Sequence, residues 1–173
     1  MEILENKTAW AAHYRQNWLA QAQENGFPNW KIYQHPRNEA VPGTPGVRLD
    51  ISRLLFITSS GAYLPAQQRP FDAANLYGDY SMRSFPVGTP FSELAYGHEH
   101  YDHAHIDQDP QSALPLSYLA ELVTTGVIGD LAPNVVSFMG YQPDSARVVD
   151  ELIPPIIKEA QAQHVQAALL APV

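Results

Sequence analysis

The pattern that most constrains this fold is an alternation of short apolar runs with helical segments. The apolar runs are Arg53–Thr58, Val135–Met139 and Val165–Pro172, with Tyr80–Phe85 as a further possible strand. The helical segments between them are Leu116–Thr125 and Ser145–Gln163. Strands that alternate with helices favour a parallel sheet. We therefore predict an α/β protein with a parallel or mixed sheet and flanking helices.

The first 50 residues differ in character from the rest. Thr8–Asn25 suits a helix that Thr8 caps and Gly26 ends, and four prolines make residues 27–46 an extended arm. We divide the chain into this N-terminal helix and proline-rich arm, residues 1–50, and a flavodoxin- or Rossmann-like α/β domain, residues 51–173. Such a helix and arm pack either on a partner subunit or back on their own domain, and both alternatives stay open.

Charge and composition exclude several classes of function. The net charge of −8 argues against binding nucleic acid or an anionic membrane. No apolar run approaches the roughly 20 residues that span a bilayer, and the first ten residues do not resemble a signal peptide, so we expect a cytoplasmic protein. The sequence has no cysteine. Disulfides, thiolate metal sites and thiol nucleophiles are therefore excluded for the sequence as given.

The end of the first apolar run is a candidate ligand site. Ser59-Ser60-Gly61 follows Thr58 directly, and ligands of open α/β sheets bind beyond the carboxyl ends of the strands. Ser59 and Ser60 are therefore candidate substrate-binding residues, with hydroxyl or backbone donors. The alternative is a simple turn in which Gly61 adopts a positive φ.

A histidine-rich segment carries most of the titratable chemistry. Four histidines lie within eight residues, interleaved with carboxylates: His98, His100, His103 and His105. Imidazoles near neutral pH serve as metal ligands, proton carriers or pH switches. The segment is therefore either a functional site or a solvated polar loop.

One interpretation of this segment is a metal site. His98, His100, Asp102 and His103 fit the pattern His-x-His-x-Asp-His, which resembles the zinc motif of metallo-β-lactamase-fold hydrolases. Alternate residues of an extended loop point the same way, so two imidazoles can reach one ion, and a second ion would activate water. This interpretation predicts a metal-dependent hydrolase or oxygenase. The proline-rich arm before the motif and the single later histidine, His164, do not match that fold.

The chain also carries a series of short motifs in a specific order. They are Leu54–Leu64, Phe71-Asp72, Asp79-Tyr80-Ser81-Met82-Arg83, His98 with Tyr101, Asp102 and Asp109, Pro115–Leu119, Glu121-Leu122, Gly126–Gly129 with Leu131-Ala132-Pro133, and Phe138-Met139-Gly140. In order and spacing they resemble the selenoprotein B family of the glycine, sarcosine, betaine and D-proline reductases. The resemblance covers roughly Arg53–Val173.

This resemblance implies a reductase component that cleaves a C–N bond next to a carbonyl carbon of an amino acid or amine-like substrate. The family places a selenocysteine or cysteine after the strand that ends here at Val173, so we expect this residue beyond Val173 and interpret the sequence as an amino-terminal part. A natural short subunit is the alternative. A selenolate is ionised at neutral pH, as a low-pKa thiolate is, and is a strong nucleophile. The best-known members use a pyruvoyl group on a partner subunit, so we expect a homo- or hetero-oligomer.

The family motif also selects candidate site residues. His98 would donate a proton or bind a substrate carboxylate, and Tyr101 and Asp102 would orient the substrate. Asp109 is a candidate substrate-binding residue, although an aspartate among prolines often caps a turn. The sequence has Gln108 where the family often has a lysine, which removes an anion contact. A third alternative is a non-catalytic binding or scaffold subunit that uses the N-terminal helix.

Overall fold

The computed structural model of the chain describes residues 3–40, 43, 46–98 and 101–173. Its helices are α1 (Lys7–Tyr14), α2 (Ala20–Asn25), α3 (Ala104–Gln108), α4 (Leu116–Thr124), α5 (Ser145–Arg147) and α6 (Ile153–Ala162). Its strands are β1 (Arg53–Thr58), β2 (Ala62–Tyr63), β3 (Met82–Pro86), β4 (Ala95–Tyr96), β5 (Asp130–Leu131), β6 (Asn134–Phe138) and β7 (Ala167–Ala171). The π-helical turns are Arg15–Leu19 and Val148–Leu152, and the short 3-10 turns are Trp30–Ile32, Leu49–Ile51, Phe91–Glu93 and Pro110–Ser112.

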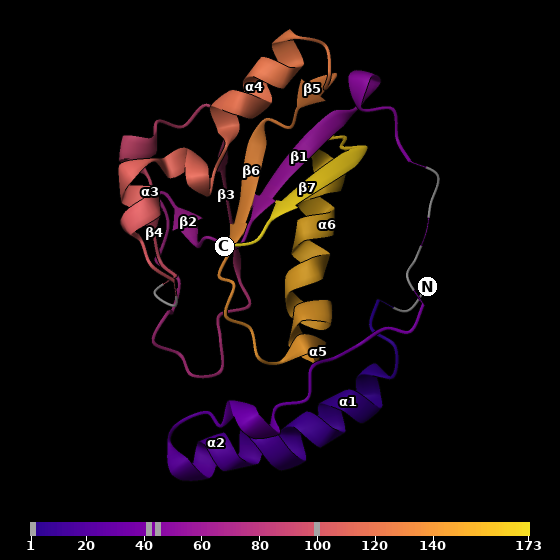
Figure 1. The fold of residues 1–173 in the computed structure, drawn as a ribbon, viewed down its shortest axis with the longest axis vertical. Helices are drawn as coiled ribbons and strands as arrows, with labels where there is room; N and C mark the ends of the chain where they lie inside the picture. Colours follow the sequence, from indigo (N-terminus) through magenta and orange to yellow (C-terminus); the bar gives the residue numbers. More distant parts are fainter. Residues whose placement is uncertain (1–2, 41–42, 44–45, 99–100) are drawn as a thin grey trace.

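The main sheet is mixed, with β1 between β6 and β7 (Figure 1). Strands β5, β6 and β7 all run parallel to β1, whereas β3 pairs antiparallel with β6. Strands β2 and β4 form a separate antiparallel pair. The predicted α/β fold with a parallel or mixed sheet and flanking helices is thus confirmed. Its flavodoxin- or Rossmann-like arrangement stays a prediction.

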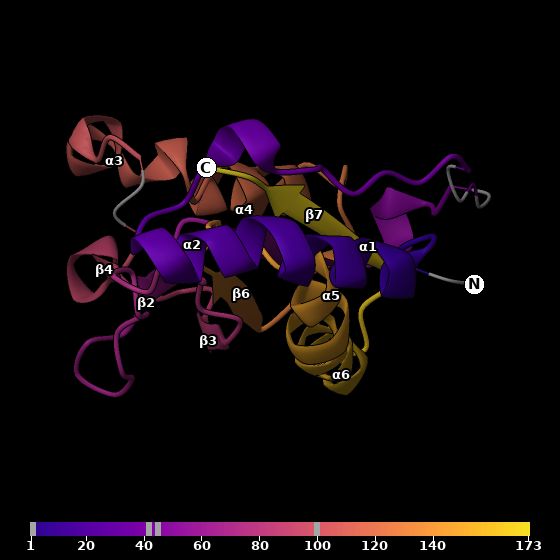
Figure 2. The same ribbon diagram turned by 90° about the horizontal axis from the view of Figure 1, so that it is seen from below.

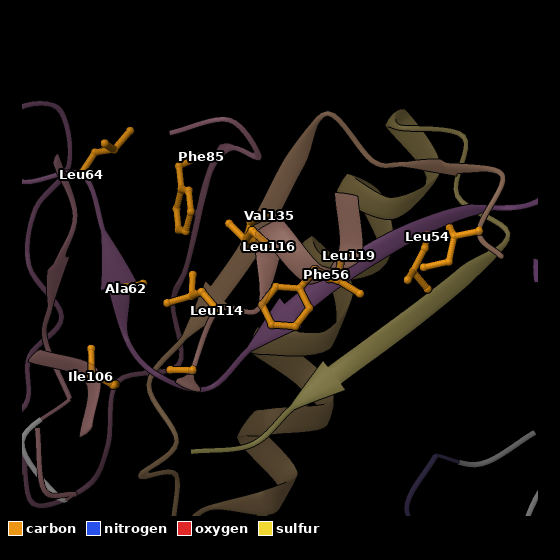
Figure 3. Packing of buried hydrophobic residues seen from close by; sticks show 12 residues of the cluster. Leu54, Phe56, Ala62, Leu64, Phe85, Ile106, Leu114, Leu116, Leu119 and Val135 are labelled. Atoms are coloured by element: carbon orange, nitrogen blue, oxygen red, sulfur yellow. The ribbon is translucent and has the colours of Figure 1, made fainter. Parts of the chain in front are cut away.

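Strand β1 is buried on both faces, which explains its continuous apolar sequence. Leu54 and Phe56 pack with Leu116 and Leu119 of α4 on one face (Figure 3). Leu55, from the other face, belongs to a cluster against α6. A fully buried side chain of this size contributes about 1.5–3 kcal/mol. The sheet therefore lies between α3 and α4 on one side and α6 on the other, and its strand ends are fixed by this packing.

The last helical segment stays helical through its two prolines. Asp144 caps α5, because its side chain accepts hydrogen bonds from the N–H groups of Ala146 and Arg147 at 3.0 and 3.2 Å. Pro154 and Pro155 have no N–H for the preceding turn. The π-helical turn Val148–Leu152 ends two residues before Pro154, so the helical segment changes pitch near the prolines and continues as α6.

The N-terminal helix packs on its own chain. Tyr14, Trp18 and Ala22 are buried from one stripe of this helix. Figures 1 and 2 agree in placing α1 and α2 beyond the end of the sheet to which β7 runs. The sequence left open whether the helix packs on a partner subunit or on its own domain. In the structure it packs on its own domain. Within the ranges given above, no helix has the length and apolar character needed to cross a bilayer.

Candidate functional site

Ser59 joins the carboxyl ends of three strands. Its backbone N–H donates to the carbonyl of Ala171 at 3.2 Å, and its carbonyl accepts from the N–H of Gly140 at 3.1 Å. Its hydroxyl oxygen accepts from the backbone N–H of Val173 at 2.9 Å. Hydrogen bonds to Ser59 therefore hold the carboxyl ends of β1, β6 and β7 together.

A cavity of about 420 Å³ opens at this point. Its lining residues are Ser59, His98, Phe138, Gly140, Tyr141, Leu170, Pro172 and Val173. The carboxyl edge of parallel strands is where ligands of α/β proteins bind, and apolar walls with a few polar groups are typical of small-molecule sites. Ser59 and His98, both predicted site residues, thus share one cavity. We call it the strand-end pocket.

Two glycines make room for His98, which is buried at 5 % exposure. A Cβ on Gly61 would lie 2.8 Å from the His98 backbone nitrogen, and one on Gly140 would lie 2.9 Å from Nε2 of the ring. Gly61 also has a φ of +70°, so the turn expected at this glycine is present. A larger residue at Gly61 would displace the His98 backbone, and one at Gly140 would displace the imidazole.

Tyr101 braces the loop that carries His98. Its hydroxyl donates to the Ser60 carbonyl at 3.1 Å, and its ring lies edge-on to His98 and stacks on His103. His103 in turn contacts the His98 carbonyl through Nε2 at 2.7 Å, and a carbonyl can only accept, so Nε2 carries the proton. Burial, with the nearby Tyr96 and Asp107, raises the pKa of the Tyr101 phenol, which therefore stays a donor at neutral pH.

The two predicted carboxylates cap local turns instead of lining the strand-end pocket. Asp102 is exposed and accepts from the N–H of Ala104 at 2.9 Å, at the start of α3. Asp109 is exposed and accepts from the N–H of Gln111 at 2.9 Å, so the expectation that it caps a turn is met. Their predicted contacts with substrate stay predictions.

Ser60, the other serine predicted to bind substrate, is not among the residues that line the pocket. It is fully buried, and in the described part of the chain its hydroxyl has no hydrogen-bond partner. Its carbonyl holds Tyr101, as given above. The substrate-binding role predicted for Ser60 stays a prediction, since Ser60 does not line the cavity.

Comparison with known proteins returns two curated relatives. The chain is 29% identical over 114 residues to D-proline reductase subunit gamma of Acetoanaerobium sticklandii, which covers 66% of this chain and 46% of that protein. It is 30% identical over 112 residues to sarcosine reductase complex component B subunit beta of Peptoclostridium acidaminophilum, which covers 62% of this chain and 25% of that protein. Over about two thirds of its length, the chain is thus similar to subunits of two reductases.

These matches confirm the resemblance that the motifs indicate. They cover only part of each protein. The chain spans less than half the length of one reductase relative and a quarter of the other. Both relatives are, by name, subunits of larger assemblies. No protein-family model matches the sequence, and no solved structure matches it.

The metal interpretation gains no support from the geometry. Among residues 3–40, 43, 46–98 and 101–173, no group of three or more histidines and carboxylates is placed to hold an ion. His100, one of the four predicted ligands, lies outside the described residues. The hydrolase or oxygenase alternative therefore stays a prediction.

Sequence reasoning missed much of the pocket wall. Gly140 had a signal, because Phe138-Met139-Gly140 is one of the reductase-like motifs. Tyr141 had none, and its position follows from tertiary contacts: its hydroxyl donates to the Leu76 carbonyl at 3.0 Å. Leu170 belongs to the predicted apolar run Val165–Pro172, yet its side chain is 55 % exposed beside the cavity.

Proposed function

We propose that this chain is a component of a reductase system for reductive C–N bond cleavage, with the strand-end pocket as part of its substrate site. The proposal rests on the relationship to the two reductase subunits and on one structural observation. His98, Ser59 and Val173 line a single cavity at the carboxyl edge of the sheet. The substrate would be a small amino acid or amine-like molecule, since the cavity is small and largely apolar.

The nucleophile of this chemistry would follow β7. The resemblance implies a selenocysteine or cysteine directly after Val173, and this residue would supply a nucleophile that is ionised near neutral pH. The hydrogen bond from Val173 to Ser59 holds the backbone at the lip of the cavity. A side chain attached to the next residue would therefore start at the cavity that His98 also lines.

The described residues would position the substrate and move one proton. His98 would donate a proton to the departing nitrogen or bind the substrate carboxylate, because its ring reaches the cavity between Ser59 and Gly140. Tyr101 would keep the ring in place through the Ser60 carbonyl. A pyruvoyl-containing partner subunit, which the resemblance implies, would complete the site, so we propose a hetero-oligomer.

The absence of cysteine from the sequence allows a sharp test. A single cysteine appended directly after Val173 is the only thiol, and its alkylation rate by iodoacetamide as a function of pH reports its pKa. We expect a pKa below the ordinary value of about 8.5, because a nearby imidazole stabilises the thiolate. His98→Gln should return the pKa toward that value.

The matched control is His105→Gln, which removes an exposed imidazole of α3 outside the cavity. It should leave the thiol pKa unchanged. An ordinary thiol pKa in the parent chain, or equal effects of the two substitutions, would overturn the proposed site.

A further inference from the structure

The N-terminal segment reaches the strand-end pocket through the loop 140–144 that follows β6. Tyr141 of this loop lines the cavity. The Trp30 ring lies edge-on to Tyr141, with centroids 5.8 Å apart and an interplanar angle of 80°. The hydroxyl of Tyr33 donates to the carbonyl of Pro143 at 2.8 Å. Two residues of the N-terminal segment thus contact the loop that forms a wall of the site.

These two residues are themselves held by buried aromatic neighbours. Trp18 is 1 % exposed, and its ring centroid lies 5.1 Å from Trp30 and 5.8 Å from Tyr33. The Trp30 and Tyr33 rings are also in edge contact at 5.3 Å. Such pairs add about 0.5–1.5 kcal/mol beyond the area they bury. The position of Trp30 is therefore fixed by the N-terminal helix.

Tyr141 is also held by a contact with a second segment, and it lines two hollows. Its hydroxyl donates to the Leu76 carbonyl. A second hollow of about 440 Å³ shares Tyr141 as a wall, and its lining residues are Pro28, Trp30, Ala73, Ala74, Asn75, Leu76 and Tyr141. Moving the Tyr141 ring would enlarge the strand-end pocket toward this second hollow.

We infer that Trp30 is a positioning residue for the site and that Tyr141, which it holds, sets the size of ligand that the pocket admits. The N-terminal segment then helps to determine the shape of the site. This inference rests on the proposed function only in taking the strand-end pocket as the substrate site. Trp30 acts through Tyr141, because it lines the second hollow and not the pocket itself.

The first test is nuclear magnetic resonance on the full chain with Trp30→Ala, Trp30→Phe and Trp10→Ala. Trp10 belongs to the same aromatic cluster, but its ring packs on Tyr14 and Tyr33. Trp30→Ala should shift the amide signals of Gly140 and Tyr141, and Trp30→Phe should restore them. Trp10→Ala should lower the free energy of unfolding without these shifts. Unchanged signals in Trp30→Ala, or equal shifts in both alanine variants, would overturn the inference.

The second test measures the width of the strand-end pocket. It uses the chain that carries one cysteine after Val173. The ratio of its alkylation rates with N-phenylmaleimide and N-methylmaleimide measures tolerance for bulk. We expect Trp30→Ala to raise this ratio several-fold and Trp10→Ala to leave it unchanged. An unchanged ratio in Trp30→Ala counts against the inference. Because the ratio does not depend on the thiol pKa, this test and the His98 test can fail separately.

Discussion

His98 depends on the absence of side chains at two positions from different parts of the chain. Gly61 follows β1 and faces the His98 backbone, whereas Gly140 follows β6 and faces the ring. A histidine buried this deeply beside backbone is held in one orientation, and a proton donor must be so held to act on a bound molecule. The sequence marked Gly61 as a turn and Gly140 as a strand end. The sequence alone could not show that either glycine contacts His98, because these contacts join segments that are distant in the chain.

Gly140→Ala should displace the imidazole of His98. The new methyl group would lie 2.9 Å from Nε2 and 3.3 Å from the Ser59 hydroxyl oxygen, closer than van der Waals contact allows. We expect a loss of about 1–3 kcal/mol in the free energy of unfolding, as for other overpacked sites. The His98 ring signals in nuclear magnetic resonance spectra should shift as well.

The control for this substitution is Gly88→Ala, where an added methyl group has no neighbour within 4 Å. It should leave the His98 signals unchanged and the stability equal or slightly higher, since alanine restricts the unfolded chain. If Gly140→Ala behaves like Gly88→Ala, the tight packing of His98 against Gly140 is wrong.

At the scale of elements, the long apolar segments were predictable and the short polar ones were not. Strand β1 matches its predicted bounds, Arg53–Thr58, because both of its faces are buried and its four central residues are all apolar. Helix α3 lies in the histidine-rich segment, for which the sequence predicts either a functional site or a solvated polar loop. It is five residues long, and Ile106 is its buried residue. A single buried side chain in five residues gives no periodicity to detect.

The β2–β4 pair was also beyond sequence reasoning, since each strand has two residues. Its effect on the site is nevertheless direct. Ala62 pairs with Tyr96, two residues before His98, and Gly97 donates its N–H to the Gly61 carbonyl at 2.9 Å. This pair brings the histidine segment against the end of β1.

Tyr96 makes this pair sensitive to alkaline pH. Burial, with the nearby Asp107, raises the pKa of Tyr96 to about 12. The folded chain thus holds the phenol proton more tightly than the unfolded chain, in which the tyrosine pKa is about 10. The stabilisation is fully present below about pH 10 and is lost as the pH rises through about 12. We expect the free energy of unfolding in urea to fall over this interval.

Tyr96→Phe should weaken this pH dependence without abolishing it, because burial also raises the pKa of Tyr101. Near neutral pH the variant should be at least as stable as the parent. The Tyr96 hydroxyl is buried without a partner among the residues described, and removing such a group is not costly. Tyr118→Phe, at an exposed tyrosine, is the control. Identical urea curves for both variants across this pH range would contradict the argument.

At the scale of the whole molecule, the location of the site follows from the order of strands and helices. A parallel arrangement of β1, β6 and β7 requires their carboxyl ends to meet, so the sequence already placed Ser59 near the end of the last strand. The contribution of the N-terminal segment was not predictable in this way. The aromatic residues of that segment fit a partner surface as well as an intramolecular one, and the sequence carries no signal that separates them.

Deleting residues 1–46 therefore tests the whole-molecule arrangement. The scaffold alternative expects loss of oligomerisation and an unperturbed remainder. The structure predicts a perturbed remainder, because the deletion removes the Tyr33–Pro143 hydrogen bond and the ion pair from Lys7 to Asp150. The midpoint of urea unfolding should fall, and the amide signals of Gly140 and Tyr141 should shift as they do in Trp30→Ala. A remainder with the parent's midpoint and unshifted signals, and with only its oligomeric state altered in size-exclusion chromatography, would instead assign the N-terminal segment to assembly.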